Sequence, residues 1–288
     1  MKCWIERLTA NAGPALFIAL TVLPVACALG YSVLYSIELT GLLAKGLTLK
    51  HWQQLLGSSE IWLSLGYSLN IAVATVALAG TFALSLTLSG HRYLTAGYAA
   101  RWLLLPLTLA PTAAALAVLE LWSGAGLISR ILHGLDLINT PAQFPSPVRA
   151  APGIGIILAE LLLAVPFLSA YFLRVFVQQR IGALLTAAQS LGATPFQALV
   201  RVALPQLLQK SAGMLLLYGI FVFGAFEIPL LLGPRNPDMI SVLVQRKFAG
   251  FDLSRKPEAF VAITLYAVII LTLLAAAVRR SPWRGDAR

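Results

Sequence analysis

The chain has 288 residues, of which 59% are hydrophobic and only 11% are charged. Soluble domains carry about 25% charged residues, so this composition excludes an ordinary soluble domain and indicates a polytopic membrane protein. The formal net charge of +10 fits anionic lipid headgroups and membrane orientation better than nucleic-acid binding. Two cysteines and three scattered histidines are too few for a disulfide framework or a metal site.

Six apolar runs are long enough to cross a bilayer, which takes about 20 residues each. The first follows a basic N-terminus and is too long for the apolar part of a signal peptide, so we expect a retained span. Continuous hydrophobicity argues against a membrane β-barrel, whose strands would alternate. The predicted fold class is therefore all-α, one transmembrane domain over residues 1–288, with spans at about 13–37, 66–89, 101–121, 151–174, 211–233 and 258–278.

The distribution of basic residues predicts the orientation. Six spans place both termini on one side, and that side carries 12 of the 21 basic residues, against 9 on the other. Those 12 also cluster closer to the ends of the spans, where positive charge keeps a segment in the cytoplasm. We therefore expect a multi-pass protein with both termini in the cytoplasm.

Glutamates lie within or beside the third and fourth spans. Glu120 is near the outer end of the third predicted span, from which its side chain can reach the membrane interface. Glu160 is near the middle of the fourth. Ionisable residues at that depth are costly and usually face a bundle interior or a wet cavity. Glu160 is therefore expected either to fix helix packing through a hydrogen bond or to line a transport path.

Residues 178–210 between the fourth and fifth spans are too polar to cross the membrane. A helix over residues 183–191 is expected to end at Gly192, where glycine allows a left-handed C-cap. Thr194, Pro195 and Gln197 then form a predicted N-terminus with a capping box. This second helix is expected to end near Leu204, because Pro205 follows.

Helical spacing places four apolar side chains of this second helix on one face: Phe196, Leu199, Val200 and Ala203. Gln197 and Arg201, four residues apart, lie on another face. Such a helical hairpin at a membrane surface has two interpretations. It rests on lipid headgroups, or it docks into a cytoplasmic partner.

The fifth span carries a third polar feature. Glu227 lies about six residues from its outer end, and Pro229 follows in the same helix. Because proline cannot bond the carbonyl one turn earlier, this half of the span is expected to be bent or unwound. Two intramembrane carboxylates, Glu160 and Glu227, would favour a cation if they line a path.

The loop between the fourth and fifth spans resembles the cytoplasmic signature of binding-protein-dependent ABC importer permeases. That signature is Glu-Ala-Ala, three residues, Gly, nine residues, then Ile-x-Leu-Pro. This chain has Thr186, Ala187 and Ala188, then Gly192 after three residues, and Val202, Ala203, Leu204 and Pro205 after nine more. The position of this motif between the fourth and fifth spans, and the total of six spans, also match that family. Thr186 replaces the usual glutamate, which contributes polar contact to the ATPase.

The resemblance implies a coupling helix within residues 178–210 that docks on a separate ATPase subunit. It also implies two ABC ATPases, a second permease, an extracytoplasmic binding protein and a bacterial inner membrane. With Thr186 in place of the acid, docking would depend on Gln197, Arg201 and the apolar face. In the resembling family this part of the fifth span lines the cavity near the outer gate, which implies a substrate path near Glu227 and Pro229. The segment 226–239 is also similar to permeases for polyamines, iron and thiamine, which implies a substrate of that group.

We do not expect catalysis by this chain. It lacks the G-x-x-x-x-G-K-[ST] phosphate loop, so ATP and magnesium would bind the partner ATPase. One alternative is a proton-coupled secondary transporter with Glu160 and Glu227 as the relay, although no internal repeat supports it. A membrane-embedded structural or assembly subunit is another.

Overall fold

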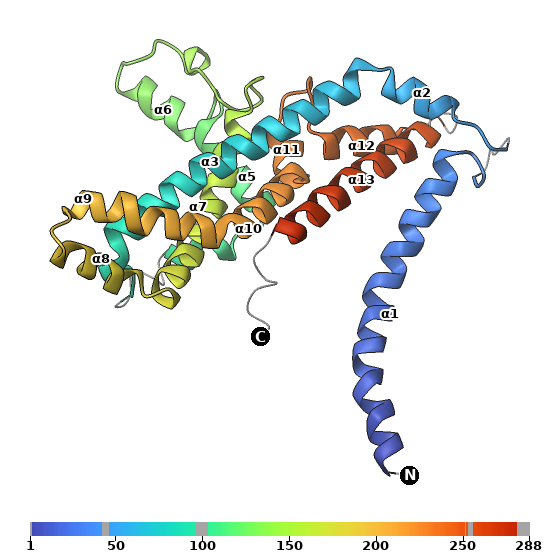
Figure 1. Cartoon of the computed structure of the whole chain (residues 1–288). Helices are drawn as coiled ribbons and strands as arrows, with labels where there is room; N and C mark the ends of the chain where they lie inside the picture. Colours follow the sequence, from blue (N-terminus) through green and yellow to red (C-terminus); the bar gives the residue numbers. More distant parts are fainter. Residues whose placement is uncertain (1, 42–45, 96–102, 251, 253–255, 281–288) are drawn as a thin grey trace. The chain divides into compact units, whose positions relative to one another are not determined.

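A computed structural model describes residues 2–41, 46–95, 103–250, 252 and 256–280, and the regular structure in these ranges is helical (Figure 1). Six of the helical stretches are long and apolar enough to cross a membrane, which confirms the predicted all-α class with six spans. The membrane-length stretches are Leu16–Ser36, Ser59–Gly90, Pro111–Gly134, Ile154–Gln178, Pro195–Phe223 and Lys256–Ala276.

The elements follow one another along the chain as labelled in Figure 1. The first half contains α1 (Lys2–Ser36), α2 (Lys50–Leu56), α3 (Ser59–Thr95), the 3₁₀ turn η1 (Leu105–Thr108), α5 (Pro111–Trp122), α6 (Leu127–Gly134) and the 3₁₀ turn η2 (Pro141–Gln143). The second half contains α7 (Ile154–Gln178), α8 (Ile181–Ser190), α9 (Pro195–Ala198), the π-helical turn η3 (Leu199–Ala203), α10 (Leu204–Phe223), α11 (Glu227–Leu232), α12 (Ile240–Ala249) and α13 (Lys256–Arg280).

The third and fifth spans differ most from the predicted limits, and the second begins seven residues earlier than predicted, at Ser59. The third, predicted at 101–121, is divided into η1 and α5 by two extended residues, Leu109 and Ala110, because Pro106 and Pro111 interrupt the hydrogen-bond ladder. Residues 101–102 lie outside the described part of the chain. The fifth, predicted at 211–233, starts as an unbroken helix at Pro195 and breaks after Phe223.

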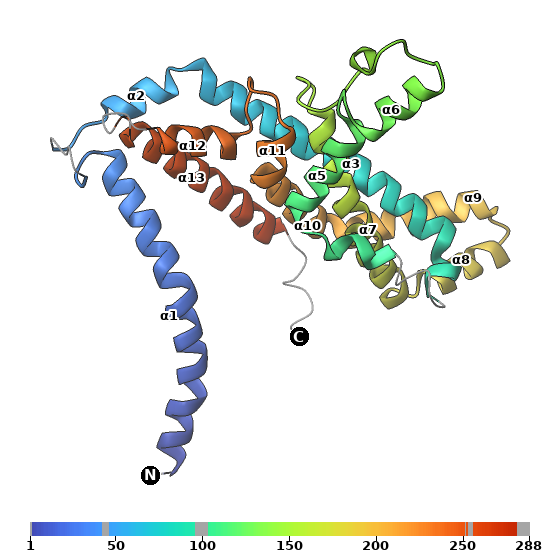
Figure 2. The same cartoon turned by 180° about the vertical axis from the view of Figure 1, so that it is seen from behind.

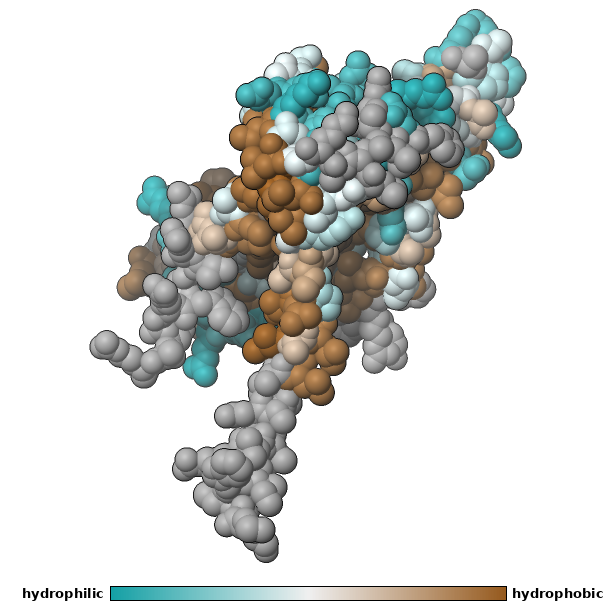
Figure 3. All heavy atoms as spheres, turned by 90° about the vertical axis from the view of Figure 1, so that its right-hand side faces the viewer, coloured by the Kyte–Doolittle hydropathy of each residue, from teal (hydrophilic) through white to brown (hydrophobic). Residues whose placement is uncertain are grey.

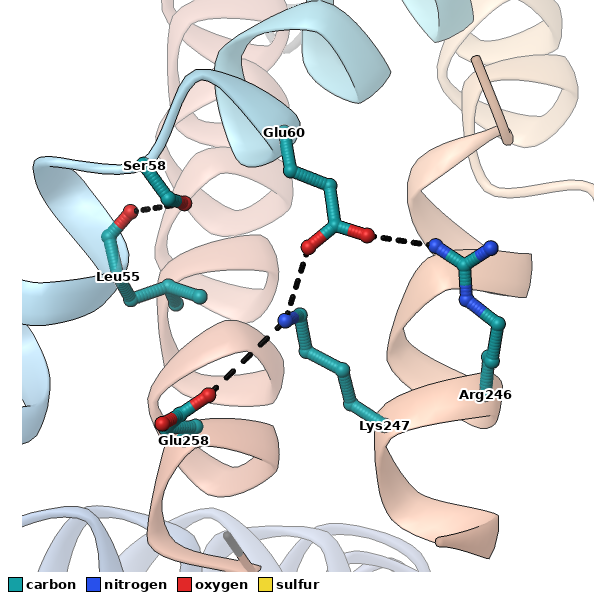
Figure 4. A network of polar contacts seen from close by, with 6 residues as sticks. All are labelled: Leu55, Ser58, Glu60, Arg246, Lys247 and Glu258. Atoms are coloured by element: carbon teal, nitrogen blue, oxygen red, sulfur yellow. Dashed lines mark hydrogen bonds and ion pairs between the residues drawn. The ribbon is translucent and has the colours of Figure 1, made fainter. Parts of the chain in front are cut away.

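The chain divides into two compact units, Met1–Trp62 with Leu243–Leu271 and Leu63–Val242 with Thr272–Arg288. In the first unit, charged side chains join the start of α3 to α12 and α13 (Figure 4). Glu60 accepts from Arg246 Nη2 at 2.6 Å and pairs with Lys247 Nζ at 3.0 Å, and Lys247 also lies 4.0 Å from Glu258.

Aromatic and polar contacts hold the rest of the first unit. Tyr35 of α1 stacks on Phe260 of α13 with ring centroids 4.1 Å apart. Near the end of α1, Glu38 pairs with His51 Nε2 of α2 at 2.7 Å. The end of α1 is therefore joined to α13 by ring stacking, and the chain just after α1 is joined to α2 by an ion pair.

The second unit has a core of small and large side chains shared by α3 and α7. Ala79 and Ala83 of α3 are buried against Ala164, Leu168 and Phe172 of α7. Alanines let two helix backbones approach closely. Membrane helices depend on such close packing, because lipid tails are as apolar as the side chains and the hydrophobic effect does not drive the helices together. This core supports α10, whose Leu215 and Tyr218 pack against the same cluster.

Large apolar side chains remain exposed along the spans. On α1 they include Leu16, Phe17, Leu20 and Val25, and brown hydrophobic side chains cover broad areas of the face drawn in Figure 3. A soluble protein rarely exposes such continuous apolar surface, whereas a lipid-facing helix requires it.

Candidate functional site: the hairpin between the fourth and fifth spans

The segment between α7 and α10 folds as a helical hairpin, with α8 and α9 side by side at one end of the second unit (Figures 1 and 2). The turn between them is a Schellman motif. Gly192 has φ +91° and its N–H bonds to the Gln189 carbonyl, while Ala193 N–H bonds to the Ala188 carbonyl. The predicted left-handed cap at Gly192 is therefore confirmed.

The start of α9 has the capping box that the sequence predicts. Thr194 Oγ1 accepts from Gln197 N–H at 3.3 Å, and Gln197 Oε1 accepts from Thr194 N–H at 3.1 Å. Pro195 occupies the first turn, where its missing N–H leaves no bond unmade. Two orphan donors of the helix N-terminus are thus satisfied within four residues.

The expected end of this second helix near Leu204 is wrong, because the helix continues through Pro205 into α10. The π-helical turn η3 precedes the proline, and Leu204 N–H bonds to the Leu199 carbonyl, five residues earlier. A wider turn accommodates a proline ring that would clash with the carbonyl four residues back in an α-helix. One continuous helix therefore joins the hairpin to the fifth span.

The inner side of the hairpin is anchored in a buried cluster. Ile181 and Leu185 of α8, with Ala198, Ala203 and Leu207 of the facing helix, pack against Val175 and Phe176 at the end of α7. Leu84 and Leu88 of α3 cover this cluster from a second side. The hairpin is therefore fixed to two membrane helices, and its position follows theirs.

The outer side of the hairpin displays most of the sequence-predicted site residues. Thr186, Ala187, Gly192, Gln197, Arg201 and Pro205 are exposed, while Ala188 and Leu204 are half-buried. The Thr186 hydroxyl donates to the Gly182 carbonyl at 3.1 Å. The Thr186 side chain is thus bonded to its own helix.

The predicted apolar face is only partly right. Leu199 and Ala203 pack inward, whereas Phe196 is 74% exposed and Val200 also faces outward. The reason is η3: a π turn changes the number of residues per turn, so residues spaced for an ordinary helix do not stay in one row. Phe196 and Val200 belong instead to the outer surface.

Two exposed leucines complete this surface, and the sequence patterns did not predict them. Leu191 is 88% exposed just past the end of α8, and Leu184 is exposed about two turns earlier. Their signal in the sequence is weak, since Leu191 is a single leucine among small and polar neighbours and Leu184 is followed directly by the buried Leu185. We define the hairpin tip as the exposed apolar residues Leu184, Leu191, Phe196 and Val200.

The hairpin is also basic. Residues 178–210 contain Arg180, Arg201 and Lys210 and no acidic residue. The Arg201 side chain is exposed beside the tip residues of the same helix. The surface therefore offers apolar contacts and positive charge, which suits a partner with an apolar pocket and carboxylates.

The three glutamates have different surroundings. Glu160 is 1% exposed within α7, whereas Glu227 is exposed in the first turn of α11 and Glu120 near the end of α5. Glu120 lies two residues before the end of α5 at Trp122. An open groove of about 410 Å³ is lined by other residues, among them Phe167, Tyr218 and Phe221.

The bend expected near Pro229 is present. The fifth span breaks between α10 and α11 at residues 224–226, and Pro229 lies inside α11. The Ala225 carbonyl, which Pro229 cannot bond, accepts from Ser241 Oγ of α12 at 2.5 Å. Sequence spacing could not have found Ser241, because it lies 16 residues from its partner.

Comparisons with known proteins place the fold. No protein-family model matches the sequence, and no curated protein matches it. One similar solved structure is a bacterial ABC transporter involved in the import of the acidic polysaccharide alginate. That match has a TM-score of 0.69 and 17% identity, and it covers 100% of both chains.

A second similar structure is a bacterial alginate ABC transporter in complex with an alginate pentasaccharide-bound periplasmic protein. Its TM-score is 0.70 at 18% identity, with 99% of this chain and 96% of that chain covered. At such identities the likeness is one of fold, and it extends over essentially the whole chain.

Proposed function

We propose that this chain is a transmembrane permease subunit of a binding-protein-dependent ABC importer, and that the hairpin tip docks on an ATPase subunit. The observation that carries the proposal is the hairpin itself. It presents apolar side chains and Arg201 to solvent while its other side is fixed to α7 and α3. The full-length likeness in fold to chains of ABC transporters supports it.

The coupling mechanism follows from the continuous helix Pro195–Phe223. A force applied to the tip by a moving partner passes along this helix into the fifth span, without a loop that would absorb it. The buried cluster below the hairpin passes the same movement to α7 and α3. In this role the chain does not itself catalyse a covalent reaction. ATP and magnesium would be held by the partner.

The proposed assembly has two ABC ATPases, a second permease that is identical or paralogous, and an extracytoplasmic binding protein. Both termini and the hairpin would face the cytoplasm of a bacterium, with the spans in the inner membrane. Since Thr186 supplies no charge, the ATPase groove is expected to provide carboxylates that face Arg201 and a pocket for Phe196. Glu160, Glu227 and Pro229 would contribute to the path of a small cationic solute.

The proposal is tested by substitutions in the assembled transporter. Phe196→Ser is expected to weaken ATPase docking by about 1–2 kcal/mol, roughly 5- to 30-fold in affinity. Leu47→Ser is the matched control, because Leu47 is a comparably exposed apolar residue (71%) outside the hairpin. The measurement is co-purification of the ATPase, together with ATP hydrolysis stimulated by loaded binding protein. Equal docking by the two variants would contradict the proposal.

Gly192→Pro tests coupling in the same assembly. Proline cannot adopt φ +91° and cannot donate to the Gln189 carbonyl, so the turn between α8 and α9 must rearrange while the spans remain. We expect transport to be lost while basal ATP hydrolysis persists. Normal transport by a folded Gly192→Pro protein would rule out a coupling role for the hairpin.

A further inference from the structure

A second exposed apolar surface lies at the far end of α7 from the hairpin. The helix α6 follows α5 after a short break and precedes the loop that leads into α7. Because the 25 residues of α7 span about 37 Å, α6 and the hairpin lie at opposite ends of a membrane-length helix. In Figures 1 and 2, α6 stands apart from α8 and α9.

The membrane-length stretch Pro111–Gly134 contains both α5 and α6, and a break divides the two helices within it. Ser123 and Gly126 are extended, with ψ 163° and 179°, so α6 does not continue the axis of α5. Trp122 is the last residue of α5, and its carbonyl accepts from Ser146 Oγ at 2.9 Å. Tryptophan favours the headgroup level of a bilayer, so α6 begins five residues beyond a residue typical of the membrane interface.

The helix α6 has three distinct sides. Ile128, Ser129 and Leu132 are buried or half-buried. A second side carries exposed Leu127 and Ile131 and, just past the helix end, Leu135, at successive spacings of four. The third side is polar and exposed: Arg130 Nε donates to the Ala125 carbonyl at 3.0 Å, and His133 Nδ1 is 3.1 Å from the Ile138 carbonyl.

This division fits a helix that lies in a membrane interface. Such a helix buries its apolar side among the outer acyl chains and keeps its polar side in water. The remaining side of α6 faces its own protein, which fixes the helix beside the end of α5. The apolar stripe also continues the exposed apolar surface of α5 at Leu116 and Leu121, which meets lipid in a membrane span.

We infer that α6 is an interfacial helix whose stripe of Leu127, Ile131 and Leu135 inserts into the lipid leaflet at which α5 ends. The charges near the stripe are Arg130, His133 and the exposed Asp136. They lie off the apolar side and therefore permit shallow insertion. Anchoring of α6 would hold the loop 135–153, and with it the start of α7, at a constant depth. This inference rests only on the membrane spans and stands apart from the importer assignment.

The experiment uses the full chain in nanodiscs, with Cys3 and Cys27 replaced by serine because Cys27 is an exposed free thiol. Nitroxide labels are attached at Leu127→Cys, Ile131→Cys or Leu135→Cys, and at His133→Cys as the polar-side control. Collision with oxygen and with a water-soluble nickel chelate is then measured. The oxygen-to-nickel ratio is expected to be several-fold higher at the three stripe positions than at His133.

The three stripe labels should also report the same depth, because an interfacial helix lies parallel to the membrane plane. A helix inserted along the membrane normal would separate positions 127 and 135 by about 12 Å. Nickel accessibility at Ile131 equal to that at His133 would overturn the inference and indicate a stripe that awaits a soluble partner. Low collision with both reagents at Ile131 would also overturn it, since protein would then cover the stripe.

Discussion

Arg180 and Gly192 end two successive helices with the same left-handed backbone turn, at φ 50° and 91°. Only the second is glycine. A side chain in this conformation costs on the order of 1–2 kcal/mol, so Arg180 stores strain at the turn between α7 and α8. At Gly192 no atom lies within 4 Å of the position that a Cβ would take, so its requirement for glycine is conformational and not steric.

Gly192→Ala is therefore expected to destabilise the hairpin turn by about 1 kcal/mol. Gly192→Asn should cost less, because asparagine tolerates the left-handed region. Amide hydrogen exchange at Gly192 and Ala193, whose N–H groups close the Schellman motif, measures the effect locally. The comparison variant Arg180→Gly should be near neutral, as relief of strain is offset by backbone entropy. Unchanged exchange in Gly192→Ala would contradict this account.

At the scale of elements, the fifth span contains two prolines in different settings. The helix continues through the first, and the second follows a break in the helix. Pro205 follows a π turn and the helix continues. Pro229 lies beyond the break at residues 224–226, and the Ala225 carbonyl, which it cannot bond, accepts a hydrogen bond from Ser241 of α12. The backbone interruption is thus stabilised from another helix, as irregular backbone at membrane depth requires.

Ser241→Ala removes the donor to the Ala225 carbonyl and is expected to destabilise the second unit by about 1 kcal/mol. Thermal unfolding in detergent measures the loss as a lower Tm. Ser241→Thr is the control, because it keeps the hydroxyl at the same position. The explanation fails if Ser241→Ala unfolds at the wild-type temperature, or if Ser241→Thr is equally destabilised.

At the scale of the whole molecule, the two ends of α7 carry different surfaces. The hairpin at one end is basic with exposed apolar side chains, and α6 at the other is amphipathic. Between them Glu160 is buried in α7, six residues after the start of the helix at Ile154. A buried carboxylate within a span is a functional-site hypothesis by default, and its role is testable in the proposed assembly.

Glu160→Gln keeps the shape of the side chain and removes its charge. If Glu160 contributes to a cation path, uptake of labelled spermidine or thiamine should fall at least about tenfold, while ATP hydrolysis stimulated by the binding protein persists. Glu120→Gln is the control, since Glu120 is exposed near the end of α5. Wild-type uptake by Glu160→Gln would assign this carboxylate to packing. Uptake of an acidic oligosaccharide alone would exclude the cationic class.

The six spans and the internal geometry of the hairpin could be predicted from the amino-acid sequence without any tertiary information. Both depend on short-range physics: each span needs about 20 apolar residues, and the caps at Gly192 and Thr194 are closed by partners within five residues. These features are therefore readable from local composition and spacing.

Tertiary packing was needed to establish which side chains of the hairpin face outward and how the fifth span continues. The continuation through Pro205 depends on a π turn packed against α7 and α8, and that turn moved Phe196 and Val200 to the outer surface. The bond from Ser241 to Ala225 and the burial of Glu160 likewise arise between helices. Such contacts join residues distant in the chain, so local periodicity carries no record of them.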